Sequence, residues 1–354
     1  MSQNYCVIMA GGVGSRFWPL SKNNYPKQFL DVLGTGKSFI RATFERFLPV
    51  VPADNFVVVT NAAYRDLVLQ QLPELKADQV LCEPMRRNTA PCIAYAAYHI
   101  KARCHDALIA VTPADHLVTN EVEFQRIIQT GFRFVDQPSH ADALLTIGIR
   151  PSRPETGYGY IEVAPDSLSS SGEVVPMQSF KEKPDLPTAE HFLASGNFFW
   201  NSGIFIWTLD GIMHAFQQQL PDMVRLFEGG AALFGTTDEQ DFINSHFAQC
   251  PNISIDYGVM EHAPLRYTIP ADFGWSDIGT WGSLYTHAAH DANANAVSGN
   301  AIVVETSNSV VNIEDGTEAI VQGLDHCLVA YRGGSLLVCR LQDEQRIKQW
   351  VEQL

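Results

Sequence analysis

A short glycine-rich segment, AGGVGSR at residues 10–16, directly follows the apolar run YCVIM. Glycines at the end of a buried strand leave backbone N–H groups uncovered, and such groups can cradle phosphate oxygens. Two cations follow, Arg16 and Lys27. Arginine suits multidentate contacts with phosphate, and lysine suits a point contact. These residue types predict a loop that binds a polyphosphate; the alternative is a tight turn without ligand.

Two better-known phosphate motifs are excluded by single residues. The dinucleotide fingerprint G-x-G-x-x-G fails because Phe17 stands where its third glycine is required. The segment GTGKS at 34–38 looks like the end of a P-loop, but Asp31 stands where the first glycine is required. We therefore expect neither a Rossmann oxidoreductase nor a P-loop enzyme, and we interpret GTGKS as a turn that leads into a helix.

Eight segments in a fixed order carry a resemblance to a known family. The chain resembles the sugar-phosphate nucleotidylyltransferases, and among them most closely the mannose-1-phosphate guanylyltransferases. The segments span about residues 6 to 281 and read MAGGVGSRFWPLSKNNYPKQFL, EPMRRNTAPCIA, VTPADH, ETGYGYIE, FKEKP, NSGIFIW, IDYGVME and WSDIGTW. One such segment would be weak evidence, whereas eight in order are specific.

The resemblance implies a reaction in which a sugar 1-phosphate oxygen attacks the α-phosphorus of a nucleoside triphosphate and expels diphosphate. Such a transfer depends on alignment and charge neutralisation more than on a protein nucleophile. The resemblance assigns the catalytic cations to Arg16, Lys27 and Lys183. It assigns nucleotide binding to Ala10, Gly11, Gly12, Gly14, Ser15, Arg16, Lys27, Glu83, Asn88 and Thr89.

The choice of base depends on the segment CEPMRRNTAPC at 82–92. Its form resembles the guanylyltransferase version and favours GTP over dTTP or UTP. Guanine needs an acceptor for its N1–H and N2–H2 donors, which a backbone carbonyl or Glu83 could supply. The alternative for Asn88 and Thr89 is a helix cap, with Thr89 as a plausible N-cap of the following helix.

Two aspartates are candidate metal ligands, Asp115 after a strand and Asp277 at what the pattern predicts as a helix start. Mg²⁺ prefers oxygen ligands and often takes only one or two carboxylates together with water and phosphate. In the resembled family, aspartates at these positions hold the metal, so we expect Mg²⁺ as the cofactor. The alternative for Asp277 taken by itself is an N-cap.

The sugar site is expected on the second half of the catalytic domain. The resemblance places Gly157, Tyr158, Glu182, Asn201 and Asp256 there, with Lys183 reaching the sugar phosphate or the α-phosphate. Without the resemblance, a charged strand facing solvent would explain KEKP at 181–184, and a strand with a glycine bulge would explain TGYGY at 156–160.

These residues need an α/β scaffold to position them. Apolar runs at 5–10, 55–60, 79–84, 106–113 and 143–149 alternate with helical patterns at 38–48, 62–72, 89–104 and 123–135. Such alternation predicts a Rossmann-like, mostly parallel sheet with flanking helices. From about residue 150 the pattern favours antiparallel strands, with PDSLSSSGE at 165–173 as a turn. Several helices follow from 210 to about 249.

The flexible segment DANANAVSG at 291–299 suggests a domain boundary. We expect a nucleotidylyltransferase catalytic domain over residues 1–288 and a small β-rich domain over 289–354. The roughly 55 residues that follow this flexible segment make a thin core by themselves, so the tail is expected to pack on the main domain or on a second subunit. By resemblance it would support a homodimer. It is too short for the isomerase domain of longer relatives, so we expect no isomerase activity.

Composition limits the partners of the chain. The net charge of −15 argues against a nucleic-acid surface but allows a small anionic substrate. No apolar run is long enough for a membrane span, and the start does not resemble a signal peptide. The seven cysteines contain no C-x-x-C pair and are interpreted as reduced core residues of a cytoplasmic protein.

The leading hypothesis is therefore a mannose-1-phosphate guanylyltransferase that uses GTP, mannose 1-phosphate and Mg²⁺. The nearest alternatives keep the fold and change the substrate, to a heptose or fucose 1-phosphate, or to glucose 1-phosphate with dTTP or UTP. A non-catalytic sensor of sugar nucleotides is an alternative of another class. Its expected sign would be loss of Lys27, Lys183 or a metal aspartate, and all are present.

Overall fold

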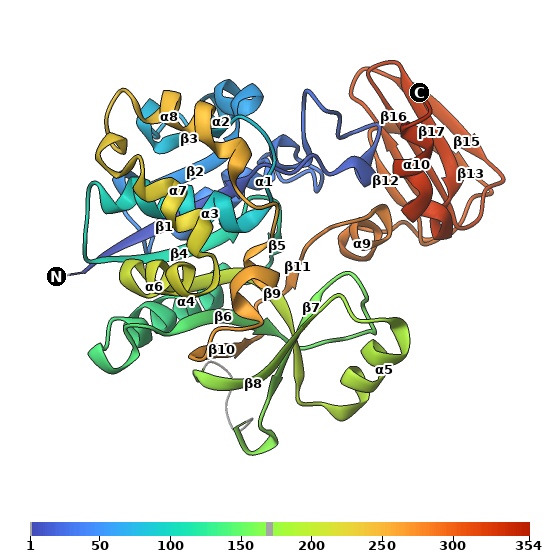
Figure 1. Cartoon of the computed structure of the whole chain (residues 1–354). Coiled ribbons are helices and arrows are strands. Elements are labelled where there is room, and N and C mark those ends of the chain that lie inside the picture. Colours follow the sequence, from blue (N-terminus) through green and yellow to red (C-terminus); the bar gives the residue numbers. More distant parts are fainter. Residues whose placement is uncertain (1, 168–172) are drawn as a thin grey trace. The chain divides into compact units, whose positions relative to one another are not determined.

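The computed structural model describes residues 2–167 and 173–354 and divides the chain into two compact units (Figure 1). The first unit comprises Met1–Gly11, Phe44–Ala114 and Val118–Trp275. The second comprises Gly12–Thr43, Asp115–Leu117 and Ser276–Leu354. Most of the turn predicted at 165–173 lies outside the described residues. The boundary predicted between 288 and 289 falls between α9 (Trp281–His287) and β12 (Ala296–Ser298) and stays a prediction.

The first unit is built on one large sheet of nine strands within the described residues. In spatial order they are β3 (Val80–Glu83), β2 (Phe56–Asn61), β1 (Gln3–Ala10), β4 (Ala107–Pro113), β9 (Phe198–Thr208), β6 (Leu144–Ile149), β10 (Arg266–Ala271), β8 (Val175–Glu182) and β7 (Gly159–Val163). The pairs from β3 to β4 are parallel, β9 runs antiparallel to β4 and β6, and β7 pairs antiparallel with β8 and β9. The predicted parallel half and antiparallel hairpin are confirmed.

The helices of this unit cover the sheet. They are α2 (Arg65–Gln71), α3 (Thr89–Lys101), α4 (Glu121–Val135), α5 (Leu186–Ser195), α6 (Leu209–Gln219), α7 (Pro221–Glu228) and α8 (Glu239–His246), while α1 (Phe39–Phe47) passes from one unit into the other. Helices α3, α6 and α7 pack together (Figure 1), with the rings of Tyr98 and Phe227 stacked at 5.2 Å. Helix α4 has a side-chain N-cap, since Asn120 Oδ1 accepts a hydrogen bond from Glu123 N at 3.1 Å.

One predicted helix cap is wrong. The N-cap of α3 is Asn88, which has a φ of 66°, and Thr89 is the first helical residue. The Thr89 hydroxyl instead accepts a hydrogen bond from Ile255 N at 2.8 Å. The Thr89 hydroxyl thus binds a residue distant in sequence, Ile255, in place of the local helix-capping contact that the sequence pattern favours.

The second unit combines the glycine loop with the C-terminal β-strands. Strands β12, β14 (Val310–Ile313), β16 (Cys327–Arg332) and β17 (Ser335–Arg340) form one sheet, and β13 (Asn300–Val304) pairs with β15 (Glu318–Gln322) in another. The helix α10 (Ile347–Val351) follows, and the short strands β5 (Leu117–Val118) and β11 (Trp275–Ser276) mark two passages of the chain between the units.

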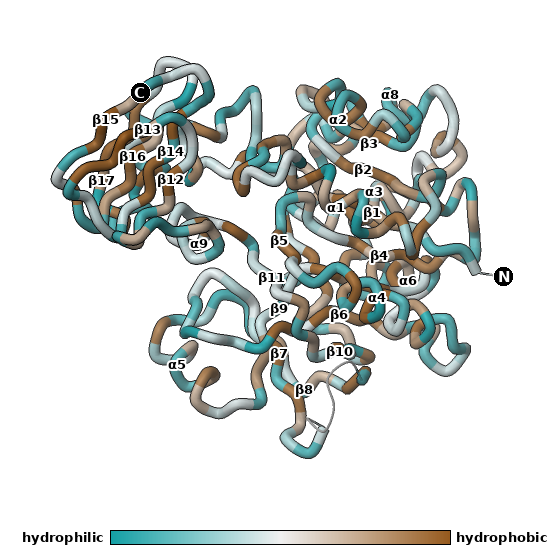
Figure 2. Tube along the Cα trace, turned by 180° about the vertical axis from the view of Figure 1, so that it is seen from behind, coloured by the Kyte–Doolittle hydropathy of each residue, from teal (hydrophilic) through white to brown (hydrophobic). Residues whose placement is uncertain are grey.

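One apolar cluster of the second unit joins segments from both ends of the sequence. Phe17 and Leu30, which flank the glycine loop, lie in it with Trp281, Val310 and Leu328. The rings of Phe17 and Trp281 are 5.3 Å apart. The C-terminal strands therefore share a core with the glycine loop. Figure 2 shows apolar stretches along these strands, and some of their apolar side chains stay exposed.

The α/β class with a β-rich C-terminal part is confirmed. All seven cysteines are unpaired, and five of them are buried, as the sequence predicts for core residues. No helix within the described residues is long and apolar enough to cross a membrane.

Candidate active site

The glycine loop leaves β1 at Ala10 and turns sharply at Gly14. Gly14 has a φ of 68° and precedes a short 3₁₀ turn, Ser15–Phe17, in which Phe17 N donates to Gly14 O at 3.0 Å. A Cβ on Gly14 would lie 2.5 Å from Cβ of Lys27, so both the backbone conformation and the space require glycine. A Cβ on Gly12 would meet nothing within 4 Å. The loop is thus open at Gly12 and tightly packed at Gly14.

Two side chains hold the carbonyls of this loop. Gln28 Nε2 donates to Gly12 O at 3.0 Å, and the Ser21 hydroxyl donates to Val13 O. Both side chains are buried. Neither residue belongs to the predicted site, yet both lie in the same motif, PLSKNNYPKQFL at 19–30. They fix the loop in one conformation, which preorganises its backbone for a ligand.

Lys27 is buried although it carries a charge. Only 3 % of its side chain is exposed, and its Nζ lies 3.0 Å from Asp115 Oδ2 and donates to the carbonyl of Asp277 at 2.6 Å. The rings of Phe17 and Phe39 lie 5.7 and 5.0 Å from Nζ. A buried ammonium requires such partners, because an unpaired charge in an apolar setting is very costly. Lys27 thus joins the two predicted metal aspartates in one cluster.

Asp115 is ionised in this setting. Burial acts to raise the pKa of its carboxyl, but the positive charge of Lys27, with a smaller effect of His116, holds the pKa below its usual range. About a third of the side chain stays exposed, 32 %. The carboxylate is therefore paired on one side and accessible on the other.

Asp277 does not begin a helix, so that expectation is wrong. The helix α9 begins at Trp281, and its cap is Thr280, whose hydroxyl accepts from Ser283 N at 3.2 Å. Asp277 Oδ1 accepts from Gly279 N at 3.0 Å in the preceding loop. Because Thr280 already caps the helix, the capping alternative for Asp277 is excluded.

Arg16 takes no part in the Lys27 cluster. It is exposed in the 3₁₀ turn after Gly14. Burial raises the pKa of the Glu344 carboxyl, and the positive charge of Arg16 opposes this rise as a smaller effect. Glu344 Oε2 accepts from Gly282 N at 2.7 Å. The sequence patterns did not point to Glu344, because it lies far along the sequence from every predicted motif.

The base segment of the first unit surrounds a buried carboxyl. Glu83, at the end of β3, is only 6 % exposed, and its Oε1 has no hydrogen-bond partner among the described residues. Burial raises the pKa of Glu83 to about 8, against smaller lowering effects of Cys92 and Arg86. Its Oε2 lies 3.6 Å from the point where a Cβ on Gly11 would be. The structure thus brings Glu83 beside Gly11.

Asn88 and Thr89 anchor the other end of the base segment. Asn88, with its φ of 66°, occupies the N-cap position of α3 without a side-chain capping hydrogen bond, while Thr89 accepts from N of Ile255, the residue before Asp256. Ala90 N also donates to Ile253 O at 3.2 Å. The base segment and the segment that carries Asp256 are therefore held together by hydrogen bonds.

Three of the predicted sugar residues, Glu182, Asn201 and Asp256, meet the predicted catalytic Lys183 in the first unit. Asn201 Nδ2 donates to Asp256 Oδ1 at 2.9 Å, and Lys183 Nζ donates to Glu182 Oε1. Burial first, and then the charge of Glu182, raises the pKa of Asp256 to about 6, while Lys183 and Asn201 oppose the rise. Burial lowers the pKa of Lys183, but Glu182 more than compensates and the pKa rises overall. This cluster offers donors and acceptors suited to hydroxyl groups.

Two further residues order this cluster, and sequence reasoning missed both. The Thr146 hydroxyl donates to Asn201 Oδ1 at 2.8 Å, which orients the amide nitrogen toward Asp256. Gly159 pairs with Glu182 in the β7–β8 register, and a Cβ there would lie 2.5 Å from Glu182 Oε2. The repeated glycine in TGYGY was the available signal for Gly159, but that motif pointed equally to Gly157.

The other two predicted sugar residues, Gly157 and Tyr158, lie just before β7. Gly157 is exposed and its N donates to Glu155 Oε1 at 3.1 Å. Tyr158 packs edge-on against Trp200 and Trp275, with ring centroids 5.3 and 5.4 Å apart, and its carbonyl accepts from Lys183 N. Tyr158 therefore adjoins the cluster around Lys183, whereas Gly157 does not contact it through any bond within the described residues.

Comparison with known proteins shows the family. A model of the nucleotidyl transferase family matches residues 5–294. The chain belongs to the nucleotidyl transferase family. The matched residues contain every predicted site residue, from Ala10 to Asp277.

Individual nucleotidyl transferases resemble the chain over nearly its full length. It is 36 % identical over 361 residues to the mannose-1-phosphate guanylyltransferase of Escherichia coli (strain K12), covering 100 % of this chain and 74 % of the relative. It is 37 % identical over 360 residues to the mannose-1-phosphate guanylyltransferase ManC of Salmonella typhimurium, covering 99 % and 73 %. A solved structure described as mannose-1-phosphate geranyltransferase from Thermus thermophilus matches with a TM-score of 0.85 and 28 % identity, covering 99 % of each chain.

Proposed function

We propose that this nucleotidyl transferase is a mannose-1-phosphate guanylyltransferase, which converts GTP and α-D-mannose 1-phosphate into GDP-mannose and diphosphate. The single observation that carries the chemistry is the cluster of Lys27, Asp115 and the Asp277 carbonyl beside the glycine loop. The names of the relatives support the choice of sugar and base.

The chain's own residues would align and neutralise the phosphates. The backbone of Gly11 to Ser15 would hold phosphate oxygens, with Gly12 giving close approach. Arg16 and Lys183 would supply the charge-assisted hydrogen bonds that strengthen as negative charge develops. The positive charge on Nζ of the buried Lys27 would interact with the triphosphate as well as with Asp115.

The residues present fit a magnesium ion. Asp115 and Asp277 offer carboxylate oxygens, the side chain of Asp115 is partly exposed, and its carboxyl is ionised. No group of three or more His, Cys, Asp or Glu side chains within the described part of the chain could hold a metal by itself, which agrees with an ion that takes phosphate and water as further ligands. Bound there, Mg²⁺ would neutralise phosphate charge. Asp115 and Asp277 would hold it, and Lys27 would keep Asp115 ionised.

The sugar would occupy the cluster around Asp256. Asp256 and Glu182 would accept hydrogen bonds from hydroxyl groups, and Asn201 would present its amide. Tyr158, held between two tryptophans, would offer an aromatic wall to the sugar ring.

For the base, we propose that Glu83 recognises guanine. Its buried Oε1 lacks a partner within the described residues, and guanine presents two adjacent donors to one carboxylate. Binding would ionise Glu83, because the charged form accepts both hydrogen bonds. Uracil and thymine lack this pair of donors, so Glu83 would favour GTP.

We further propose a cytoplasmic homodimer. The apolar side chains of Ile302 and Ile320 pair in register on β13 and β15, and they are 60 % and 75 % exposed. Such a face is costly to leave in water, and a second copy would cover it. Sedimentation of the wild type and of Ile302→Glu would test this. A dimer that the variant dissociates supports it, and a wild-type monomer refutes it.

A diphosphate-release assay tests the function. It crosses GTP, dTTP, UTP and ATP with the 1-phosphates of mannose, glucose, fucose and a heptose in the presence of Mg²⁺. Release mainly with GTP and mannose 1-phosphate supports the proposal. Release with another pair keeps the reaction class but refutes the assignment of Glu83 or of the sugar cluster. Nucleotide binding without any release would favour a non-catalytic sensor.

A further inference from the structure

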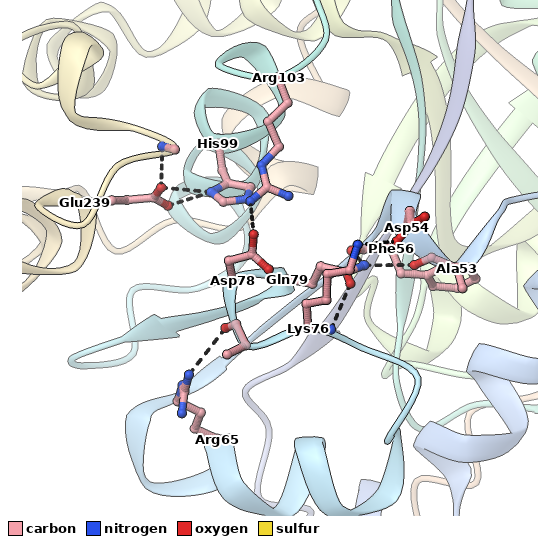
Figure 3. Close-up of polar contacts among 12 residues, drawn as sticks. Ala53, Asp54, Phe56, Arg65, Lys76, Asp78, Gln79, His99, Arg103 and Glu239 are labelled. Carbon is pink, nitrogen blue, oxygen red and sulfur yellow. Dashed lines mark hydrogen bonds and ion pairs between the residues drawn. The ribbon is translucent and has the colours of Figure 1, made fainter.

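A pocket lies in the first unit, apart from the residues of the candidate active site. Its volume is about 480 Å³, and it opens between the edge strand β3, the C-terminal half of α3 and the loop that leads into α8. Figure 3 shows the polar side chains of this region. A volume of this size suits a ligand with the dimensions of a sugar phosphate or a mononucleotide.

Two buried, charged or polar side chains belong to the inner wall. His99 and Glu239 are 2 % and 6 % exposed, and His99 Nδ1 lies 2.8 and 2.9 Å from the two carboxylate oxygens of Glu239 (Figure 3). Glu239 Oε2 also accepts a hydrogen bond from Gly235 N at 2.6 Å. In this contact Nδ1 of His99 acts as the hydrogen-bond donor, and the two Glu239 oxygens act as acceptors.

The other ring nitrogen of His99 is left without a partner. Nε2 is buried and makes no hydrogen bond within the part of the chain that the structure describes. In Figure 3 the ring edge opposite Glu239 faces Arg103 and Asp78. A buried polar atom normally has a partner, and each exception calls for an explanation. Because His99 lines the pocket, a ligand atom could supply the missing hydrogen bond.

A hydroxyl group is the partner that suits Nε2 best. Neutral His99 presents a lone pair there, whereas protonated His99 presents an N–H. A hydroxyl group both donates and accepts, so it satisfies either form. A carboxylate or phosphate oxygen would satisfy only the protonated form.

Two guanidinium groups lie on the outer wall of the same pocket. Arg103 Nη2 donates to Asp78 Oδ2 at 2.7 Å, and Arg65 Nη2 donates to Ala77 O at 3.4 Å. Each guanidinium has five N–H donors, so these contacts leave donors for a ligand. The hydroxyl groups of Thr236 and Thr237 line the pocket as well. Arginine and hydroxyl donors together are typical of phosphate binding.

We propose that this pocket is a second ligand site, which binds a phosphorylated sugar, free or as part of a mononucleotide. The phosphate would contact the remaining N–H donors of Arg103 or of Arg65, and a sugar hydroxyl would reach Nε2 of His99. A divalent cation is a poorer occupant, since both oxygens of Glu239 already accept hydrogen bonds, from His99 and from Gly235. An apolar molecule would leave Nε2 of His99 without a hydrogen bond and would not use the remaining N–H donors of the two arginines.

Calorimetric titration of the full chain tests the proposal, with ribose 5-phosphate, AMP and inorganic phosphate as probes. We expect ribose 5-phosphate or AMP to bind with a Kd below about 1 mM, and inorganic phosphate at least about tenfold more weakly. The probe that binds tighter identifies the source as a free sugar phosphate or a nucleotide. The double variant Arg65→Gln/Arg103→Gln should weaken this binding at least about tenfold. Arg133→Gln, an exposed arginine on α4, is the matched control and should bind like the wild type.

A second readout follows His99 without mutating this buried residue. In protein with ¹⁵N-labelled histidines, the Nε2 resonance of His99 should move on addition of the sugar phosphate and not of inorganic phosphate. Three results would overturn the proposal: no binding of any probe at about 10 mM, binding that the double variant leaves unchanged, or a His99 resonance that no probe moves. Because the readout is binding at these residues, it does not depend on diphosphate release.

Discussion

Lys27 Nζ lies 3.0 Å from Asp115 Oδ2, and the two residues come from distant parts of the sequence. The lysine is buried, whereas the aspartate is one-third exposed. The ion pair therefore has one side closed by the aromatic rings of Phe17 and Phe39 and one side open to a ligand. This asymmetry lets the pair keep Asp115 ionised while its other oxygen stays accessible.

Replacement of Lys27 should abolish most of the activity. Lys27→Gln removes a buried cation beside the glycine loop and allows the pKa of Asp115 to rise. We expect kcat to fall by about 10²–10³, the usual effect of losing one charge-stabilising group. Steady-state diphosphate release measures it. Lys22→Gln is the control, since Lys22 lies in the same motif but donates only weakly, at 3.2 to 3.5 Å, to residues 332–335. A normal kcat in Lys27→Gln would exclude Lys27 from the chemistry.

Binding of GTP should release a proton through Glu83. The pKa of its carboxyl is about 8 in the free protein, so most molecules carry the proton at pH 7. Guanine binding favours the ionised form, so affinity should rise as pH increases from 6 to 8 and then level off. Calorimetry in two buffers of different ionisation enthalpy counts the protons released. Glu83→Gln should abolish both the proton release and the pH dependence; if it changes neither, Glu83 does not face the base.

Asp256→Asn should stabilise the folded protein but weaken its binding of mannose 1-phosphate. The pKa of Asp256 is raised from 3.8 to about 6, so its ionisation costs stability, and that cost appears as pH rises from about 4 through 6. At about 1.4 kcal/mol per pKa unit, the variant gains up to about 3 kcal/mol above pH 7 and nothing below pH 4. Thermal unfolding from pH 4 to 8 measures the difference from wild type, with exposed Asp241→Asn as control. KM for mannose 1-phosphate should increase. A difference that does not change with pH would contradict the raised pKa.

Gly159→Ala should weaken sugar binding selectively. The new methyl group would lie 2.5 Å from Glu182 Oε2 and 3.1 Å from the ring of Phe180, so Glu182 must move. We expect KM for mannose 1-phosphate to rise by about tenfold or more, while KM for GTP changes little. Gly229→Ala is the control, because Gly229 has a helical φ of −59° and no predicted role. Equal effects on both KM values would show a general folding defect instead.

Local patterns predicted most elements of the first unit. Alternating and continuous apolar runs identify β1, β2, β3, β4 and β6, because burial on one or both faces leaves a direct trace in residue order. The direction of β9 could not be predicted in this way. An apolar strand carries no local signal that distinguishes antiparallel insertion between β4 and β6 from a parallel neighbour.

The motifs identified the residues of the site but not their partners. The pairing of Lys27 with Asp115 depends on long-range packing, as does the contact of Thr89 with Ile255. The predicted helix start at Asp277 was wrong because Thr280, three residues later, is a better placed cap. The sequence did not identify Gly159, because its role is to leave space for its cross-strand neighbour Glu182, and the sequence alone does not predict this pairing.

Helix α3 has no solvent-facing side, since every residue from Ala90 to Ile100 is buried. Beyond the first turn, its amide protons can therefore exchange with deuterium only when the surrounding unit opens as a whole, not by exposure of one face. We expect these amides to be among the slowest to exchange in the first unit, and their rates to report the free energy of its global opening. The helix begins at the base segment. Faster exchange of the amides in its first turn than in the rest of the helix would therefore report local opening of that segment.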